Sequence, residues 1–272
     1  MPSYVGSVGS KSARIALFGE APAKYEVMQG EPFVGQAGEM LSKVLQRAGI
    51  IRSVCYLDNI IRERLPNDKV DSMYQDKSNK KPTPELWKWF EDAWDRVNQL
   101  DANVVVAMGE LALRCLVDTK FEEPKASGVT SWRGSVLPGR PEINSRKVLV
   151  SIHPQYVNYQ SHMYPIFQFD MNRVRKESES PEIDVPERML QVARGPLDVD
   201  ELVARCSQAD SIAIDIETRR DQIACIGFAI SPTWAMTVPL TTSAGRFWDS
   251  VDLEAWVWEQ IATILESDTP KI

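Results

Sequence analysis

An apolar strand that runs into a glycine- and proline-rich turn and then into a helix is the feature that most constrains this chain. Residues 14–18 read as a buried strand, and residues 39–45 carry apolar side chains at helical spacing. The turn between them contains Gly19-Glu20-Ala21-Pro22-Ala23 and Gly30-Glu31-Pro32-Phe33-Val34-Gly35. Loops at the carboxyl end of a parallel strand are where α/β proteins bind ligands. We therefore expect Ala21 and its neighbours to approach a substrate closely.

Strand-like and helix-like stretches continue to alternate up to residue 176. Strands are predicted over 54–61, 103–107 and 147–152, and helices over 85–100, 110–117 and 164–175. This alternation predicts a parallel sheet with helices on both faces, a three-layer α/β/α fold.

The composition changes near residue 176. The segment 177–188 is rich in charge, serine and proline, and it is predicted to be a linker. Residues 1–176 hold 24 Lys and Arg against 20 Asp and Glu, whereas residues 177–272 hold 7 against 18. We expect a mildly basic first domain over 1–176 that can face phosphates. The acidic second domain, 189–272, would repel them unless cations neutralise it.

Neither a membrane segment nor a disulfide framework is indicated. No run approaches the ~18 consecutive apolar residues that span a bilayer, and the first twelve residues lack the apolar core of a signal peptide. The four cysteines, Cys55, Cys115, Cys206 and Cys225, are scattered without a CxxC pair. We expect a cytoplasmic protein with buried thiols and no membrane partner.

Three motifs each lie at a predicted strand end. They are the Gly-Glu-Ala-Pro turn with Pro-Phe-Val-Gly after it, Leu57-Asp58-Asn59-Ile60-Ile61, and Val148-Leu149-Val150-Ser151-Ile152-His153-Pro154-Gln155. In this order they resemble the motifs of the uracil-DNA glycosylase superfamily, most closely its family 4. The resemblance covers residues 12–176. It implies a glycosylase fold that hydrolyses the N-glycosidic bond of uracil in DNA.

The resemblance and the chemistry of base excision together suggest a role for each motif residue. Phe33 takes the place of the family's stacking residue, and its ring can support a base flipped out of the helix. The Asn59 amide offers one donor and one acceptor, which match O4 and N3–H of uracil and mismatch cytosine. His153 takes the place of the group that stabilises negative charge on uracil O2. Gln155 replaces a serine that normally contacts phosphate.

Two carboxylates compete for the remaining role. Either Glu20 or Glu26 can position the attacking water or offset the positive charge on the sugar, and the sequence leaves this open. Each motif residue also has a plain structural interpretation, because Phe33 can fill a core, Asn59 can cap a turn and His153 can be a loop histidine. Their occurrence together, in family order, favours the functional interpretation.

One family property is predicted to be absent. Family 4 enzymes hold an iron–sulfur cluster on four cysteines, two of them in an amino-terminal CxxC. This chain has no cysteine before Cys55, and only Cys55 and Cys115 fall within 1–176. Because such a cluster takes four thiolates, we predict that the glycosylase-like domain has no cofactor.

The second domain contains a different motif. Asp215 and Glu217 lie two apart in a β-rich run, so they share one side of a strand and suit Mg²⁺ or Mn²⁺. The run resembles the first exonuclease motif of the RNase H-like proofreading domains of family A DNA polymerases. The chain reaches Ile272 before that family's further metal-binding motifs. The resemblance therefore implies a partial domain, an incomplete metal site, negligible exonuclease activity, and either a piece of a longer polymerase fusion or a shortened reading frame.

Two classes of function remain open for residues 1–176. The domain can be an enzyme that removes uracil from single- or double-stranded DNA beside an attached polymerase. It can also be a non-catalytic module that reads uracil or template DNA for that polymerase. Convergence of Phe33, Asn59 and His153 on one pocket would favour the enzyme.

Overall fold

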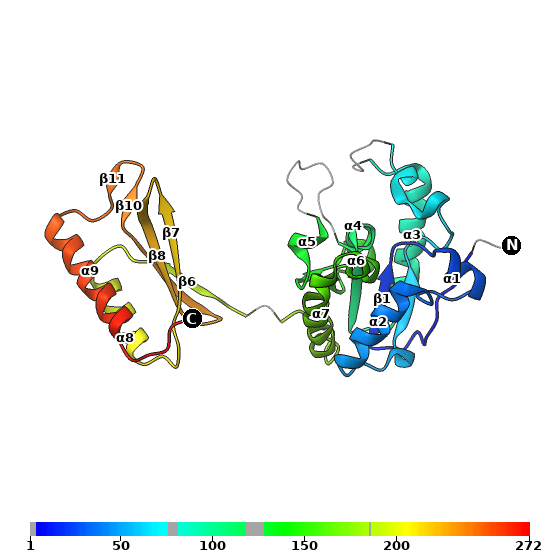
Figure 1. The fold of residues 1–272 in the computed structure, drawn as a ribbon, viewed down its shortest axis with the longest axis horizontal. Coiled ribbons are helices and arrows are strands. Elements are labelled where there is room, and N and C mark those ends of the chain that lie inside the picture. Colours follow the sequence, from blue (N-terminus) through cyan, green and yellow to red (C-terminus); the bar gives the residue numbers. More distant parts are fainter. Residues whose placement is uncertain (1–3, 76–80, 118–127, 185) are drawn as a thin grey trace. The chain divides into compact units, whose positions relative to one another are not determined.

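The computed structural model describes residues 4–75, 81–117, 128–184 and 186–272 (Figure 1). The chain forms two compact units that divide between Ile183 and Asp184. The helix α7 (Tyr164–Glu177) extends past the predicted domain boundary at residue 176. The Lys147 ammonium donates to the Glu182 carbonyl at 2.9 Å, so part of the predicted linker is held against the first unit.

The first unit is built on a five-stranded sheet with strand order β2-β1-β3-β5-β4. Its strands are β1 (Ile15–Gly19), β2 (Tyr56–Asn59), β3 (Val104–Met108), β4 (Val136–Pro138) and β5 (Lys147–Ser151). The first three and β5 are parallel, and β4 pairs antiparallel to β5 at the edge. The predicted α/β class with a parallel-rich sheet is confirmed.

Helices cover both faces of this sheet. Successive apolar side chains of each strand point to opposite faces, so each face needs a helical layer to bury it. Ala16 and Phe18 of β1 pack in the core with α3 (Pro84–Asn98) and α4 (Glu110–Leu116). Ile15 and Leu17 pack in the opposite core with α2 (Gln36–Arg47) and α7. Every residue of β1, β2, β3 and β5 is buried, as expected for parallel strands enclosed on both sides.

The helix α3 shows how local sequence fixes these elements. Thr83 caps its amino terminus, accepting a hydrogen bond from the Leu86 N–H at 3.2 Å, and Pro84 occupies the first turn, where its missing N–H costs nothing. Phe90 and Val97 continue the apolar stripe that faces the sheet. The helix therefore packs its buried stripe in the same core as Ala16 and Phe18 of β1.

The second unit has a four-stranded sheet of order β6-β9-β8-β7. The strands are β6 (Met189–Val192), β7 (Ala213–Arg219), β8 (Gln222–Ser231) and β9 (Trp234–Pro239), followed by a small hairpin of β10 (Thr241–Thr242) and β11 (Gly245–Arg246). Figure 1 shows α8 (Pro196–Ser207) and α9 (Val251–Glu266) side by side on one face of the sheet. Their buried residues, Leu202 and Ile261 among them, form one core with Phe228 and Val238.

Several elements were not predicted, among them α1 (Lys24–Gln29), α5 (Val129–Trp132), β4, α6 (Pro154–Tyr159), β6, α8 and the hairpin of β10 and β11. Two of them, α1 and α6, carry residues of the candidate site. Among the residues that the structure describes, no helix is both long and apolar enough to cross a membrane.

Candidate functional site

A pocket of about 580 Å³ lies where β1, β2 and β5 end. Residues that follow each of these strands line it, so three segments far apart in the sequence meet at one edge of the sheet. All seven residues predicted for the glycosylase site are among its lining: Glu20, Ala21, Glu26, Phe33, Asn59, His153 and Gln155.

Asn59 and Phe33 meet over the backbone of Gly19. A Cβ atom on Gly19 would lie 2.6 Å from Asn59 Oδ1 and 2.6 Å from Phe33 Cζ, closer than any real contact. The strand register brings this about, because Gly19 is the partner of Asn59 in the β1–β2 pair. The pairing continues beyond the strands, since the Ile60 N–H donates to the Gly19 carbonyl at 3.0 Å. A bare backbone at residue 19 is therefore what allows amide and ring to share one end of the pocket.

Phe33 is held in a backbone conformation that side chains seldom adopt. Its φ is 57°, in the left-handed region, and such residues persist only where their surroundings fix them. The Arg52 guanidinium donates to the Phe33 carbonyl at 2.8 Å. On the other side, a Cβ on Gly38 of α2 would lie 1.6 Å from that carbonyl oxygen. Arg52 and the missing side chain at Gly38 thus fix the backbone of Phe33, from which the ring extends into the pocket lining.

His153 presents a neutral ring with a defined tautomer. It caps α6, and its Nδ1 accepts a hydrogen bond from the Gln155 N–H at 3.2 Å, which places the ring proton on Nε2. Burial lowers the pKa of His153 from 6.5 to about 4, so the ring is uncharged near neutral pH. Its centroid lies 6.3 Å from that of Phe33. The site thus offers a neutral N–H donor beside an aromatic face.

The two carboxylates have different surroundings. Glu26 accepts hydrogen bonds from the Ala23 N–H at 3.2 Å and the Gly35 N–H at 3.0 Å, so it fastens the two loops of the pocket together. The Glu20 carboxylate does not fasten loops in this way, because among the described residues no group donates a hydrogen bond to it. Burial, followed by repulsion from Asp71 and Glu110, raises the pKa of Glu20. A desolvated carboxylate of this kind is suited to hold or release a proton.

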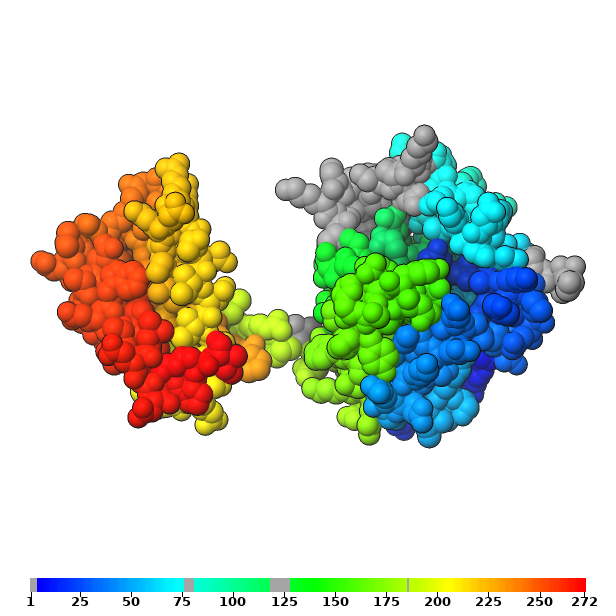
Figure 2. All heavy atoms as spheres, in the orientation of Figure 1, coloured from blue at the N-terminus to red at the C-terminus, as the bar shows by residue number. Residues whose placement is uncertain are grey.

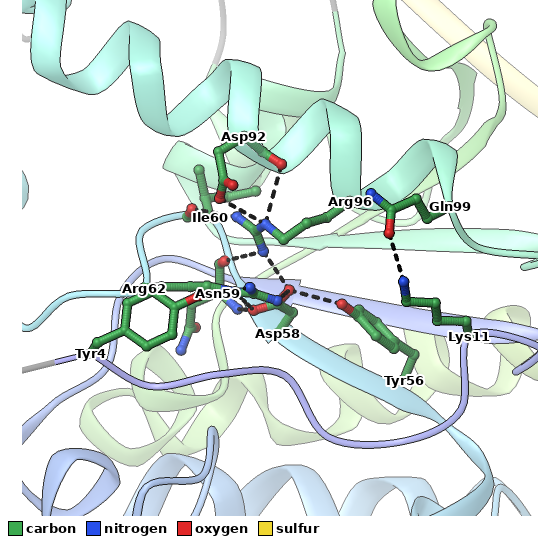
Figure 3. Close-up of polar contacts among 10 residues, drawn as sticks. All are labelled: Tyr4, Lys11, Tyr56, Asp58, Asn59, Ile60, Arg62, Asp92, Arg96 and Gln99. Atoms are coloured by element: carbon green, nitrogen blue, oxygen red, sulfur yellow. Dashed lines mark hydrogen bonds and ion pairs between the residues drawn. The ribbon is translucent and has the colours of Figure 1, made fainter.

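Asn59 is fixed from behind by a buried ionic cluster that sequence reasoning missed. Asp58, which is 1% exposed, accepts from the Asn59 N–H at 2.8 Å. Figure 3 shows Arg96 reaching from α3 to the same carboxylate, and Arg96 also donates to the Asn59 carbonyl at 3.0 Å and the Ile60 carbonyl at 2.9 Å. Arg62 binds both oxygens of Asp58, at 3.0 and 2.7 Å. The backbone of Asn59 is therefore held on both sides while its side chain lines the pocket.

Two of the remaining predicted residues lie in the pocket wall. Ala21 lines the pocket without a functional side chain, so it can contribute only backbone and contact surface. The Gln155 side chain accepts from Asn158 Nδ2 at 3.2 Å, which leaves its amide N–H groups as its donors.

The predicted metal ligands belong to the second unit. Asp215 and Glu217 share the exposed face of β7, opposite Gly227 and Cys225 of β8. Within the described residues, no group of three or more His, Cys, Asp or Glu side chains gathers in a way that could hold a metal ion. The pair alone supplies fewer ligands than Mg²⁺ takes in a nuclease site, so the predicted metal binding remains a prediction.

The cysteines of the first unit do not fit a four-thiolate cluster. Cys55 lies in the core with α2 and α7, whereas Cys115 lies in the core on the opposite face of the sheet. Burial raises the pKa of Cys55 to about 11 and that of Cys115 still further, so both stay protonated thiols. Cys206 and Cys225 belong to the second unit. The absence of an iron–sulfur cluster stays a prediction, which iron analysis of the purified chain tests.

A parallel-rich sheet enclosed by helices, with a pocket at the carboxyl ends of its strands, places the chain among the α/β proteins that bind ligands at this edge. The family model of the uracil DNA glycosylase superfamily matches residues 7–175, more than half of the chain, and the chain belongs to this superfamily.

Individual relatives agree with this assignment. The chain is 31% identical to the type-4 uracil-DNA glycosylase of Archaeoglobus fulgidus over 178 residues, 63% of this chain and 80% of that protein. It is 32% identical to the type-4 enzyme of Thermotoga maritima over 155 residues, 55% of this chain and 68% of that protein. It is also 27% identical over 172 residues, 62% of this chain, to the DNA polymerase of Bacillus phage SP01, of which it covers 16%.

Proposed function

We propose that the first unit hydrolyses the N-glycosidic bond of uracil in DNA and leaves an abasic site. The observation that carries this proposal is the convergence of Phe33, Asn59 and His153 on one pocket. None of the three side chains alone would define a reaction. Together they supply an aromatic face, a reader for one edge of a base and a donor for the opposite side of its ring.

Binding comes first and must offset the cost of extruding a base, which is a few kcal/mol. Stacking on Phe33 contributes ~1–3 kcal/mol whatever the base is. Discrimination falls to Asn59, whose amide donates to O4 and accepts from N3–H of uracil, while cytosine would place donor against donor. The Asp58 and Arg96 contacts support this role because they fix the Asn59 backbone before the base arrives. Tyr25, whose ring lies against Gly35 in the pocket wall, is our candidate for rejecting the thymine methyl group.

Cleavage of the glycosidic bond moves an electron pair from the sugar carbon into the uracil ring, so negative charge builds up on O2. The Nε2–H of neutral His153 stabilises that charge more in the transition state than in the ground state. A water molecule then adds to the sugar carbon, and the proton that it loses neutralises the released uracil anion. We assign the positioning of this water molecule to Glu20 rather than Glu26, because the Glu26 carboxylate is already engaged by two backbone N–H groups.

An assay without added metal tests this function directly. The purified chain is incubated with a single-stranded oligonucleotide that carries one uracil, and alkali-sensitive breaks are counted. A matched oligonucleotide with cytosine at that position is the substrate control, and Asn59→Ala is the protein control. We expect breaks with uracil and wild type, none with cytosine, and far fewer with Asn59→Ala. Intact DNA that wild type binds tightly and with preference for uracil would instead identify a non-catalytic reading module, and no binding at all would overturn both.

We further propose that the chain works in the cytoplasm beside a DNA polymerase. The polymerase partner is supported by the similarity to part of a phage DNA polymerase. It is also supported by the strand of the second unit that carries Asp215 and Glu217 on one face. In this proposal the second unit is part of an RNase H-like exonuclease domain that uses Mg²⁺ or Mn²⁺. With two carboxylates in place, we expect the chain to degrade no DNA when either metal is added, which a labelled-strand assay measures.

A further inference from the structure

Tyrosine rings gather where the pocket opens to solvent. Four tyrosines of the described residues are exposed, and three of them line this pocket: Tyr25, Tyr156 and Tyr159, which are 59%, 41% and 75% exposed. The fourth, Tyr4, lies outside the lining, and its hydroxyl accepts a hydrogen bond from Arg62. Large aromatic side chains left in water beside a binding pocket are typical of a surface that meets a partner.

Two short helices hold these rings beside the groups proposed to act on uracil. Tyr156 and Tyr159 are three residues apart on α6, so they project from the same face of the helix that His153 caps. Tyr25 lies in the first turn of α1, one residue before Glu26. The helix α6 packs against α2, and its outer surface is exposed (Figure 2). The rings are therefore continuous with the pocket and rest on elements that are themselves fixed.

Charge argues that phosphates are not the main contact here. Among the described residues that line the pocket, Lys24 is the only lysine or arginine, and it is outnumbered by Glu20, Glu26 and Asp68. Asp68 is paired with Arg64 at 2.7 Å. With one cation in this lining, charge neutralisation of phosphates contributes little at the rim, and the exposed rings there are suited to contact bases instead.

We propose that Tyr25, Tyr156 and Tyr159 form a stacking platform for the unpaired bases beside the flipped uracil, so that single-stranded DNA is the preferred ligand. This rests on the proposed function and names its substrate class. Aromatic faces bind any base whose own face is free, which gives affinity without sequence preference. In a duplex the neighbouring bases stack on one another, and their faces are not available to the rings.

Binding measurements without catalysis test the platform. Fluorescence anisotropy is used to titrate labelled oligonucleotides that contain no uracil, as single strands and as duplexes, at several salt concentrations. The test variants are Tyr156→Ala with Tyr159→Ala, and the same positions changed to Phe, which keeps the rings. Phe169→Ala is the matched control, because Phe169 is an exposed aromatic residue of α7, 62% exposed, outside the pocket lining.

We expect the double alanine variant to lose affinity for single strands by about 10-fold or more, with duplex binding and the salt slope unchanged. The phenylalanine variant and Phe169→Ala should bind like wild type. Wild-type affinity in the alanine variant would overturn the platform, as would equal losses for single strands and duplexes. A change from dimer to monomer in sedimentation on alanine substitution would instead assign the rings to a second copy of the chain.

This experiment separates the platform from the proposed catalytic function. Because the oligonucleotides carry no uracil, a chain that excises nothing can still show the single-strand preference. Conversely, a chain that excises uracil while the tyrosine variants bind normally would retain the proposed function and lose the platform.

Discussion

The sheets of the two units meet solvent differently. The first sheet has helices on both faces, and every residue of its four parallel strands is buried. The second has α8 and α9 on one face, and Asp215 and Glu217 lie exposed on the other. In the first unit, the polar groups of the pocket lie where strands end, and Glu20 and His153 are desolvated there. The comparison teaches that a sequence motif does not fix the chemistry of its carboxylates. Asp215 and Glu217 lie on an open face in contact with water, whereas burial in the pocket raises the pKa of Glu20.

The largest effect is expected from His153, the polar group that the enclosed architecture desolvates most clearly. His153→Ala removes the neutral donor that we propose for uracil O2, and we expect kcat to fall by about 10²–10³-fold. Single-turnover excision of uracil from a single strand measures this. Substrate binding should change little, since the donor acts mainly on the transition state. A loss confined to KM would contradict the assignment.

The next largest effect is expected from a glycine of the first unit, and a glycine of the second unit serves as its control. Gly19→Ala places a Cβ against both Asn59 and Phe33, and we expect kcat/KM to fall by about 10²-fold because the amide and the ring are displaced together. The control is Gly195→Ala in the second unit, where nothing lies within 4 Å of a new Cβ. It should excise uracil at the wild-type rate. Equal activity of the two variants would show that the close approach at Gly19 is unimportant.

The buried ionic cluster predicts a smaller and more specific effect. Arg96→Lys keeps a charge near Asp58 but cannot donate to Asp58, Asn59 and Ile60 at once, so we expect about a 10-fold loss of kcat/KM. In an Asn59→Ala background the same substitution should have no further effect, which a double-mutant cycle measures. Arg140→Lys is the control. Arg140 is equally buried and donates to the Arg114 carbonyl rather than to Asn59. Additive losses in the cycle would make Arg96 a purely structural residue.

Lowering the pH should destabilise the first unit through protonation of His153. Its pKa is about 4 in the folded chain and 6.5 when unfolded, so the unfolded chain binds more protons between these values. Stability is therefore lost as the pH falls from 6.5 towards 4, by at most about 1.4 kcal/mol per pH unit. Glu20, with a raised pKa, contributes in the opposite sense. Urea unfolding of wild type and His153→Gln at several pH values measures the difference, and parallel curves would contradict it.

The smallest effect is expected on the open face. Asp215→Asn combined with Glu217→Gln should leave uracil excision unchanged, because both side chains belong to the other compact unit and are exposed. The same excision assay measures this. A substantial loss would break the comparison, since it would mean that the second unit takes part in the first unit's chemistry.

Features that are set by residues close together in the sequence could be predicted from it. The strand over residues 103–107 was predicted from its apolar run, and the structure has a fully buried strand at Val104–Met108. The pocket residues Phe33, Asn59 and His153 were predicted from motifs that resemble those of the glycosylase superfamily. The short helices α1 and α6 were not, since six residues carry too little periodicity to show a helix.

Contacts between distant segments could not be predicted. Arg96 reads as a charged residue on a mostly amphipathic helix, and only the fold brings it to Asp58, 38 positions away. Likewise, Tyr156 and Tyr159 become a feature only when their exposure and the position of the pocket are known. The preference for Glu20 over Glu26 also depends on the fold, because backbone N–H groups from two loops engage Glu26.

The strand order has a consequence for how this pocket can change. Asn59 ends β2 and His153 follows β5, and β1 and β3 lie between them in the sheet. The backbone positions at which the two strands end are therefore separated by three strand-to-strand spacings of about 4.8 Å each. Insertions in the surrounding loops leave these spacings unaltered. Under the proposed function, a ligand of another size would therefore need different side chains at these two strand ends rather than longer loops.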